Sequence, residues 1–142
     1  MPAPADVQTT NGGATVGKAE AGDSVVFTFA GTVTPELVVS GWDGSPTAVT
    51  VTISHLAGSN DILTVADSGG ILTALGGVDL GGNYANTVEF TGSTMSAAGN
   101  TITVVLGTPG SGNRHTVSSP TAMSWTCPTG TAAESGAPDP EF

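Results

Sequence analysis

The stretch Thr47-Ala-Val-Thr-Val-Thr-Ile-Ser54 decides the fold class of this chain. Its apolar residues Val49, Val51 and Ile53 alternate with threonine and serine. Successive side chains of a β-strand point to opposite faces, so this stretch would have one apolar face and one hydroxyl face. Val, Ile and Thr are β-branched and fit a half-buried pleated surface better than a helix. The stretch therefore predicts a strand that packs on one side against a core.

The same alternation recurs in Ser24–Ala30 and Asn100–Leu106. Weaker runs of the same kind are Ala14–Lys18, Glu36–Ser40, Asp61–Ala66, Asn86–Phe90, Ser93–Ala97 and Thr121–Cys127. Turn-forming residues separate these runs, and the break Ala98–Asn100 predicts a hairpin. Gly70–Gly76 allows at most one helical turn. Short strands spaced by about 8–12 residues are typical of a sandwich or barrel, so we predict an all-β fold with a single β-sandwich.

Both ends of the chain differ from this pattern. Residues 1–13 and 128–142 are rich in Pro, Ala, Gly and Thr and lack alternation. They predict an N-terminal arm and a flexible C-terminal tail on either side of one module at 14–127. The start of the chain lacks the basic and apolar regions of a secretory signal. The last residues, Asp139–Phe142, are compatible with a cloning scar, and we expect no function from them.

The charge balance excludes several partners. The 142 residues include 12 acidic residues and only two basic ones, Lys18 and Arg114, for a formal net charge of -10. Binding to nucleic acid needs clustered Lys and Arg, and so does binding to anionic lipid. No stretch approaches the roughly 20 apolar residues of a membrane span. We therefore expect neither a nucleic-acid nor a membrane partner.

The residues that carry most enzyme chemistry are few and scattered. His55 follows a strand run, His115 lies in a glycine-rich loop, and Cys127 is the single cysteine. A nucleophile needs a base within reach, and nothing in this spacing supports such a pair. A standard zinc site needs three or four Cys or His ligands. The sequence predicts no enzyme, no cofactor and no catalytic residue.

A calcium site is the one metal site that the sequence leaves open. Asp43, Asp61, Asp67 and Asp79 lie in turns, and calcium takes carboxylate oxygens from loops. The same residue type, however, bonds its own backbone in ordinary turns. Both interpretations stay open, and no metal ligand is assigned.

Two tryptophans receive different predictions. Trp125 shares a strand face with Met123 and Cys127 and is expected in the core. Trp42 lies in the turn Gly41–Pro46, where its indole either is exposed as a contact point or folds back over the core. Trp42 with its neighbour Asp43 is the candidate interaction site.

Several strings resemble bacterial immunoglobulin-like modules that open on Gly-Asp-x-Val-x-Phe-x-Phe and have Trp-Thr-Pro near their end. Here the matching strings are Gly22–Pro35, Gly41–Ser45, Thr47–Ile53, Val88–Met95, Asn100–Gly107 and Met123–Thr126. The modules occur in surface proteins of actinobacteria and in virion proteins of their tailed phages. This chain departs from the pattern in having Trp125-Thr-Cys-Pro128 in place of Trp-Thr-Pro. The resemblance implies an immunoglobulin-like β-sandwich.

The resemblance also implies a class of function. It favours a non-enzymatic structural module, a capsid decoration or head-surface protein of a phage, located in the virion. Its partner would be the major capsid protein or another virion subunit, and self-association is also expected. The alternative is an extracellular adhesive or cell-surface binding domain of an actinobacterial protein.

Overall fold

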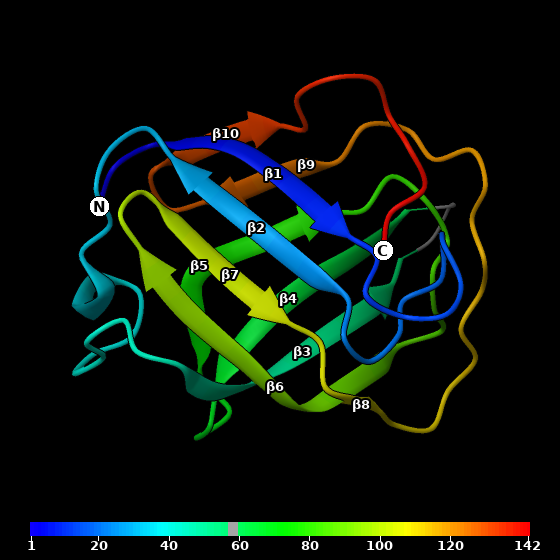
Figure 1. The fold of residues 1–142 in the computed structure, drawn as a ribbon, viewed down its shortest axis with the longest axis horizontal. Coiled ribbons are helices and arrows are strands. Elements are labelled where there is room, and N and C mark those ends of the chain that lie inside the picture. The colour runs from blue at the N-terminus through cyan, green and yellow to red at the C-terminus, as the bar shows by residue number, and fades with distance from the viewer. Residues whose placement is uncertain (57–59) are drawn as a thin grey trace.

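The computed structural model describes residues 1–56 and 60–142 and confirms the all-β fold (Figure 1). Its elements are β1 (Pro4–Thr10), β2 (Ser24–Phe29), the short 3-10 helix η1 (Pro35–Leu37), β3 (Thr47–His55), β4 (Asp61–Asp67), β5 (Leu72–Asp79), β6 (Val88–Ala98), β7 (Thr101–Val105), β8 (Thr108–Pro109), β9 (Ser124–Cys127) and β10 (Gly130–Ala133). Within the described ranges, no helix has the length and apolar character needed to cross a membrane.

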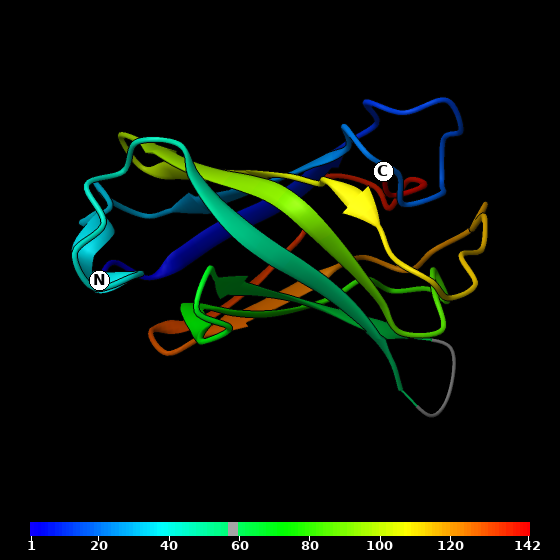
Figure 2. The same cartoon turned by 90° about the horizontal axis from the view of Figure 1, so that it is seen from below.

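All strands belong to one antiparallel sheet that curls back on itself. The strand order is β1-β2-β7-β6-β3-β4-β5-β9-β10, and β8 pairs with β6. The two end strands, β1 and β10, come into contact. The side-chain amide of Gln8 in β1 also donates a hydrogen bond of 3.0 Å to the carbonyl oxygen of Ser135, just beyond β10. The sheet is therefore nearly closed, and Figure 2 shows its two halves facing each other.

The core lies between these two halves. Trp125 is fully buried, and its indole makes edge-on contacts with Phe27 and Phe29 at ring-centroid distances of 5.1 and 4.9 Å. Met123 and Cys127 are buried beside it, which confirms the face predicted for this strand. Such edge-to-face pairs add to the stabilisation that comes from burial alone.

The strongest alternating runs are strands, as predicted, but the two runs on either side of Gly92 form one strand, β6. The inward-facing positions of β6 change phase at Gly92, whose φ of 68° permits a bulge. The hydroxyl of Ser93 then points inward, donates to the carbonyl of Phe90 at 2.8 Å and accepts from the amide of Gly107 at 2.9 Å. The bulge joins two half-strands of opposite phase in one continuous strand.

Two predicted strands are wrong. Ala14–Lys18 forms turns and bends, because its amides find partners outside a strand ladder: the Thr15 amide donates to Glu20 Oε1 at 2.7 Å, and the Gly17 amide to the Phe142 carbonyl at 3.2 Å. Glu36–Ser40 overlaps the 3-10 helix, which begins at Pro35. Proline has a fixed φ that suits the first turn of a helix and lacks the amide that a strand ladder needs.

The helical turn proposed within Gly70–Gly76 is also wrong, because β5 begins at Leu72. Gly76 has a φ of 70°, and a Cβ at this position would lie 2.1 Å from the carbonyl oxygen of Thr126 in β9. The glycine therefore allows the backbones of β5 and β9 to approach closely. A glycine-rich segment that suggests a loop by composition is here part of a strand.

Residues at both chain ends join the sheet rather than leaving it. The predicted N-terminal arm, 1–13, contains β1, and the predicted tail, 128–142, contains β10. β1 pairs with β2, and β10 pairs with β9. The ring of Phe142 is buried and lies edge-on to Tyr84 at 5.6 Å. Backbone pairing with β2 and β9 and the contact between Phe142 and Tyr84 hold these segments in place. The sequence did not indicate this, because the segments lack alternating apolar residues.

Candidate functional site

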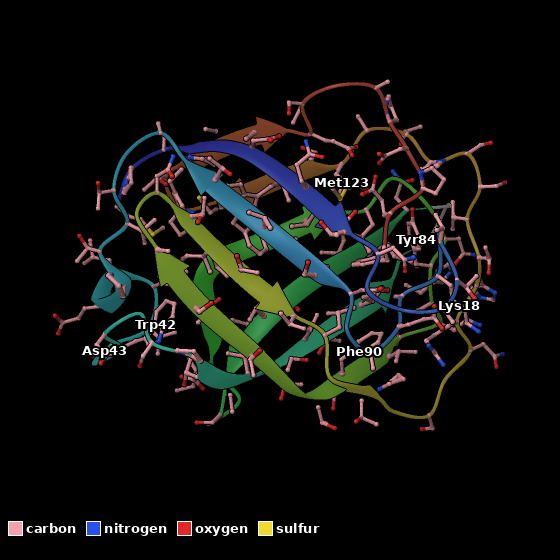
Figure 3. All side chains as sticks on the ribbon, viewed as in Figure 1. Lys18, Trp42, Asp43, Tyr84, Phe90 and Met123 are labelled. Carbon is pink, nitrogen blue, oxygen red and sulfur yellow. The ribbon has the colours of Figure 1, made fainter. Side chains whose placement is uncertain are left out.

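The two candidate interaction residues, Trp42 and Asp43, lie side by side at one end of the barrel, and Tyr84 lies at the other end (Figure 3). We call the end with Trp42 and Asp43 the Trp42 end; it includes the 30–46 connection and the turn 67–72. The opposite end carries Tyr84 and the C-terminus, and we call it the Tyr84 end.

Trp42 folds back over the core instead of standing out from the surface. Its side chain is buried, and Nε1 donates a 2.8 Å hydrogen bond to the carbonyl oxygen of Ser45. This is one of the two arrangements that the sequence left open. The indole therefore packs into the protein and does not project from the surface as a contact point.

Asp43, the second candidate contact, is exposed. Its Oδ1 accepts hydrogen bonds from the Ser45 hydroxyl at 2.6 Å and from the Ser45 amide at 3.0 Å. Both bonds favour the ionised form and hold the pKa of the Asp43 carboxyl below its usual value. The residue contributes a fixed negative charge at the Trp42 end.

A shallow groove of about 310 Å³ lies beside Trp42. Its walls come from residues 39–42, from residues 47–49 at the start of β3, and from Asp67 and Ser68. The lining mixes apolar and hydroxyl side chains with one carboxylate. It is a surface depression suited to a contacting side chain rather than an enclosed ligand cavity.

Three exposed apolar side chains belong to the segments that continue from the groove-lining residues Val39 and Ser68. Leu37 is 55% exposed, Ile71 70% and Leu72 66%. The Ala74 amide donates to the Val38 carbonyl at 3.1 Å and so brings the segments that carry them together. We call Leu37, Ile71 and Leu72 the apolar patch.

The four turn aspartates considered for calcium do not gather. Asp43 and Asp67 bind backbone amides of their own turns, and Asp79 Oδ1 does the same with Gly81 at 2.9 Å. Asp61 is fully buried, and its Oδ2 accepts the amides of Tyr84 and Ala85 at 2.6 and 2.7 Å. These carboxylates therefore serve as structural acceptors.

The histidines and the cysteine have separate partners. His55 Nδ1 lies 3.0 Å from Asp61 Oδ1, and His115 Nε2 lies 3.3 Å from Asn86 Oδ1. The buried Cys127 Sγ lies 3.3 Å from the Thr129 hydroxyl. In the part of the chain that the structure describes, no hydrogen bond joins the thiol to either imidazole. The three residues therefore do not form the cysteine–histidine pair that a thiol nucleophile would need.

A further cluster lies at the Tyr84 end, in the segment that the sequence analysis assigned to a tail. Glu134, Asp139 and Glu141 each place a carboxylate oxygen within 4.8 Å of the others. Glu134 and Glu141 are buried, whereas Asp139 is exposed. The only sequence signal was three acids within eight residues. That signal is weak, because acidic tails are common and usually solvated.

Burial dominates the electrostatics of this cluster. It raises the pKa of the Glu141 carboxyl to about 8, and the neighbouring charge of Glu134 acts in the same direction. The Thr9 hydroxyl opposes this by donating to Glu141 Oε2. Burial also raises the pKa of Tyr84, whose hydroxyl oxygen accepts the Glu141 amide at 3.1 Å.

Comparison of the chain with protein-family models, with curated proteins and with solved structures finds no match. The site therefore has to be interpreted from its own residues.

Proposed function

We propose that the protein is a non-enzymatic structural module of a phage particle that binds the capsid shell through its Trp42 end. The observation that carries this proposal is the apolar patch of Leu37, Ile71 and Leu72, on the segments that continue from the groove. Neighbouring exposed apolar side chains with a polar rim are typical of protein–protein contact sites. The location in a virion is supported by the resemblance to immunoglobulin-like modules of phage surfaces.

Charge around the patch defines the partner more closely. Glu36 and Asp43 are exposed near it, and Asp67 lines the groove. The two basic residues of the chain, Lys18 and Arg114, lie in other segments. A complementary surface would combine apolar side chains with a basic rim. We propose that the capsid shell protein or another virion subunit carries such a surface.

The fold also determines which parts of the chain are free to bind a partner. The chain ends are not free arms that could wrap around neighbouring subunits, because β1 and β10 lie in the sheet. A rigid barrel that presents one end loses little conformational entropy when it docks. Binding is therefore expected to involve a compact surface of the 35–45 and 67–72 segments.

The first prediction tests this surface on capsids. The triple variant Leu37→Ser, Ile71→Ser, Leu72→Ser should bind purified capsids that lack the protein about tenfold or more weakly than the parent chain. Val16→Ser removes another exposed apolar side chain outside the patch and should bind normally. Cosedimentation over a range of salt concentrations measures both the affinity and its electrostatic part.

Two results would contradict the proposal. One is equal capsid binding by the triple variant and the Val16→Ser control. The other is absence of the protein from purified virions by mass spectrometry and cryo-electron microscopy. Binding to host cells or to a glycan array in place of capsids would favour the adhesive alternative.

A further inference from the structure

The carboxylate cluster at the Tyr84 end lies where three parts of the chain meet. Glu134 directly follows β10, while Asp139 and Glu141 belong to the C-terminal segment. Thr9, near the end of β1, donates its hydroxyl hydrogen to Glu141 Oε2. The Phe142 carbonyl oxygen accepts the Gly17 amide at 3.2 Å. The cluster therefore joins the C-terminal segment to both strands at the seam of the sheet.

One oxygen of this cluster has no partner. Glu141 is fully buried, and its Oε1 is the one buried side-chain nitrogen or oxygen atom without a hydrogen bond in the described part of the chain. Glu134 Oε1, by contrast, accepts the Met123 amide at 3.1 Å. Buried polar atoms in folded proteins almost always have a partner, so an unpaired carboxylate oxygen points to a missing ligand.

The charge of the cluster is not balanced by a side chain. Within the described ranges, no lysine or arginine nitrogen lies within 4.0 Å of a carboxylate oxygen; the His55 imidazole contacts Asp61, and the Arg114 guanidinium donates to the Ala19 carbonyl. Two buried carboxylates and an exposed third one are thus held together without an ion pair to Lys18 or Arg114. Burial of unpaired charge is costly, and a bound cation removes that cost.

The donor set indicates which cation. All three side chains offer carboxylate oxygen and none offers nitrogen or sulfur, which suits a hard cation. Their oxygens lie within 4.8 Å of one another, which fits a shared ion with bonds of about 2.3–2.6 Å. Calcium tolerates irregular geometry and mixed water ligation, whereas magnesium demands a near-ideal octahedron. The exposed side of Asp139 leaves room for water.

We propose that Glu134, Asp139 and Glu141 bind a calcium ion that fastens the C-terminal segment to the seam between β1 and β10. This proposal is independent of the capsid-binding function, because it concerns the opposite end of the barrel. The ion would link β10 directly to the chain end. It would also lie close to Tyr84, whose hydroxyl contacts the Glu141 amide.

The second prediction concerns calcium binding by the full chain. Titration calorimetry should give one site with a dissociation constant of about 10⁻⁴–10⁻³ M, the range of calcium sites in extracellular modules. Asp139→Asn and Glu141→Gln should each weaken it by roughly tenfold or more, since calcium affinity depends on ligand charge. Glu89→Gln removes an exposed carboxylate on β6 and should bind as the parent does.

A second readout locates the ion. Terbium, a calcium substitute, should show luminescence sensitised by Tyr84, the single tyrosine of the chain. Calcium should displace it, and Asp139→Asn, an exposed substitution that does not threaten the core, should require roughly tenfold more terbium or higher for the same luminescence. Absence of calcium-dependent heat and of terbium luminescence in the parent chain would overturn the proposal. Equal affinity in the Asp139→Asn and Glu89→Gln variants would overturn it as well.

Discussion

The two ends of the barrel depart from the usual arrangement of apolar side chains inside and charged side chains outside, each in a different way. At the Trp42 end, apolar side chains stand in solvent: Leu37, Ile71 and Leu72 are each more than half exposed. At the Tyr84 end, carboxylates are buried: Asp61 and Glu141 are inaccessible. The free energy of the system falls when a partner covers exposed apolar surface. It also falls when a hydrogen-bond donor or a cation pairs with a buried carboxylate. The difference separates an end suited to a protein partner from an end suited to internal closure.

The two ends also treat their aspartates differently. Asp43 accepts hydrogen bonds within its own exposed turn, from a residue two positions away. Asp61 accepts amides more than twenty residues away and organises the connection between β5 and β6. A local acceptor shapes one turn, whereas a buried long-range acceptor holds separate segments together.

The largest expected effect tests whether the two ends share one core. Trp125→Ala should lower the free energy of unfolding by about 3–5 kcal/mol, because it removes the buried indole that packs on Phe27 and Phe29. Denaturant unfolding followed by far-UV circular dichroism measures it. The fluorescence of the remaining Trp42 should change in the same transition. Val105→Thr, a surface change, should stay within about 0.5 kcal/mol. A separate Trp42 transition would contradict a single cooperative core.

The next effect sets the aspartates of the two ends against each other. Asp61→Ala leaves the buried amides of Tyr84 and Ala85 without an acceptor, at about 1–3 kcal/mol for each. Asp43→Ala removes an acceptor from solvated donors and should leave the free energy of unfolding almost unchanged, as surface substitutions usually do. Paired denaturation curves give both values. Equal losses would contradict the distinction between a local and a long-range acceptor.

The smallest effect concerns the titration of Asp43. Its pKa lies below the usual value because the Ser45 hydroxyl and amide bond the ionised carboxyl. A pKa lowered by folding adds stability above the unfolded pKa, and this stability is lost as pH falls through the folded pKa. Ser45→Ala removes the hydroxyl and should raise the Asp43 pKa toward its usual value, as measured by carboxyl NMR titration. Ser40→Ala should leave it unchanged, and a shift there would contradict the assigned cause.

The fold was predictable where a strand has one buried face. β3 alternates cleanly through Val49, Val51 and Ile53, and all three are buried. β5 was missed because Gly76 replaces a strand-forming residue at a point of close backbone approach. β6 was predicted as two runs because its bulge reverses the inward phase. Both failures occur where a neighbouring strand, rather than local preference, decides the backbone.

The candidate site was predictable only in part. Trp42 and Asp43 lie at the same end of the barrel, Trp42 buried and Asp43 exposed, but the exposed apolar side chains at that end come from segments more than thirty residues apart. The cluster of Glu134, Asp139 and Glu141 has no sequence motif, since its geometry depends on the C-terminal segment folding against β1 and Tyr84. Contacts between distant segments of this kind leave no recurring pattern in the sequence.

By itself, the sequence determined the all-β class, the residues of the central strands and the position of Trp125 in the core. These follow from side-chain alternation, which reports burial within one strand. Only the tertiary structure decided that the sheet nearly closes, that the chain ends join it, and that charge is buried at one end while apolar surface is exposed at the other. Those features depend on which distant segments meet, and contacts of that kind leave no local pattern.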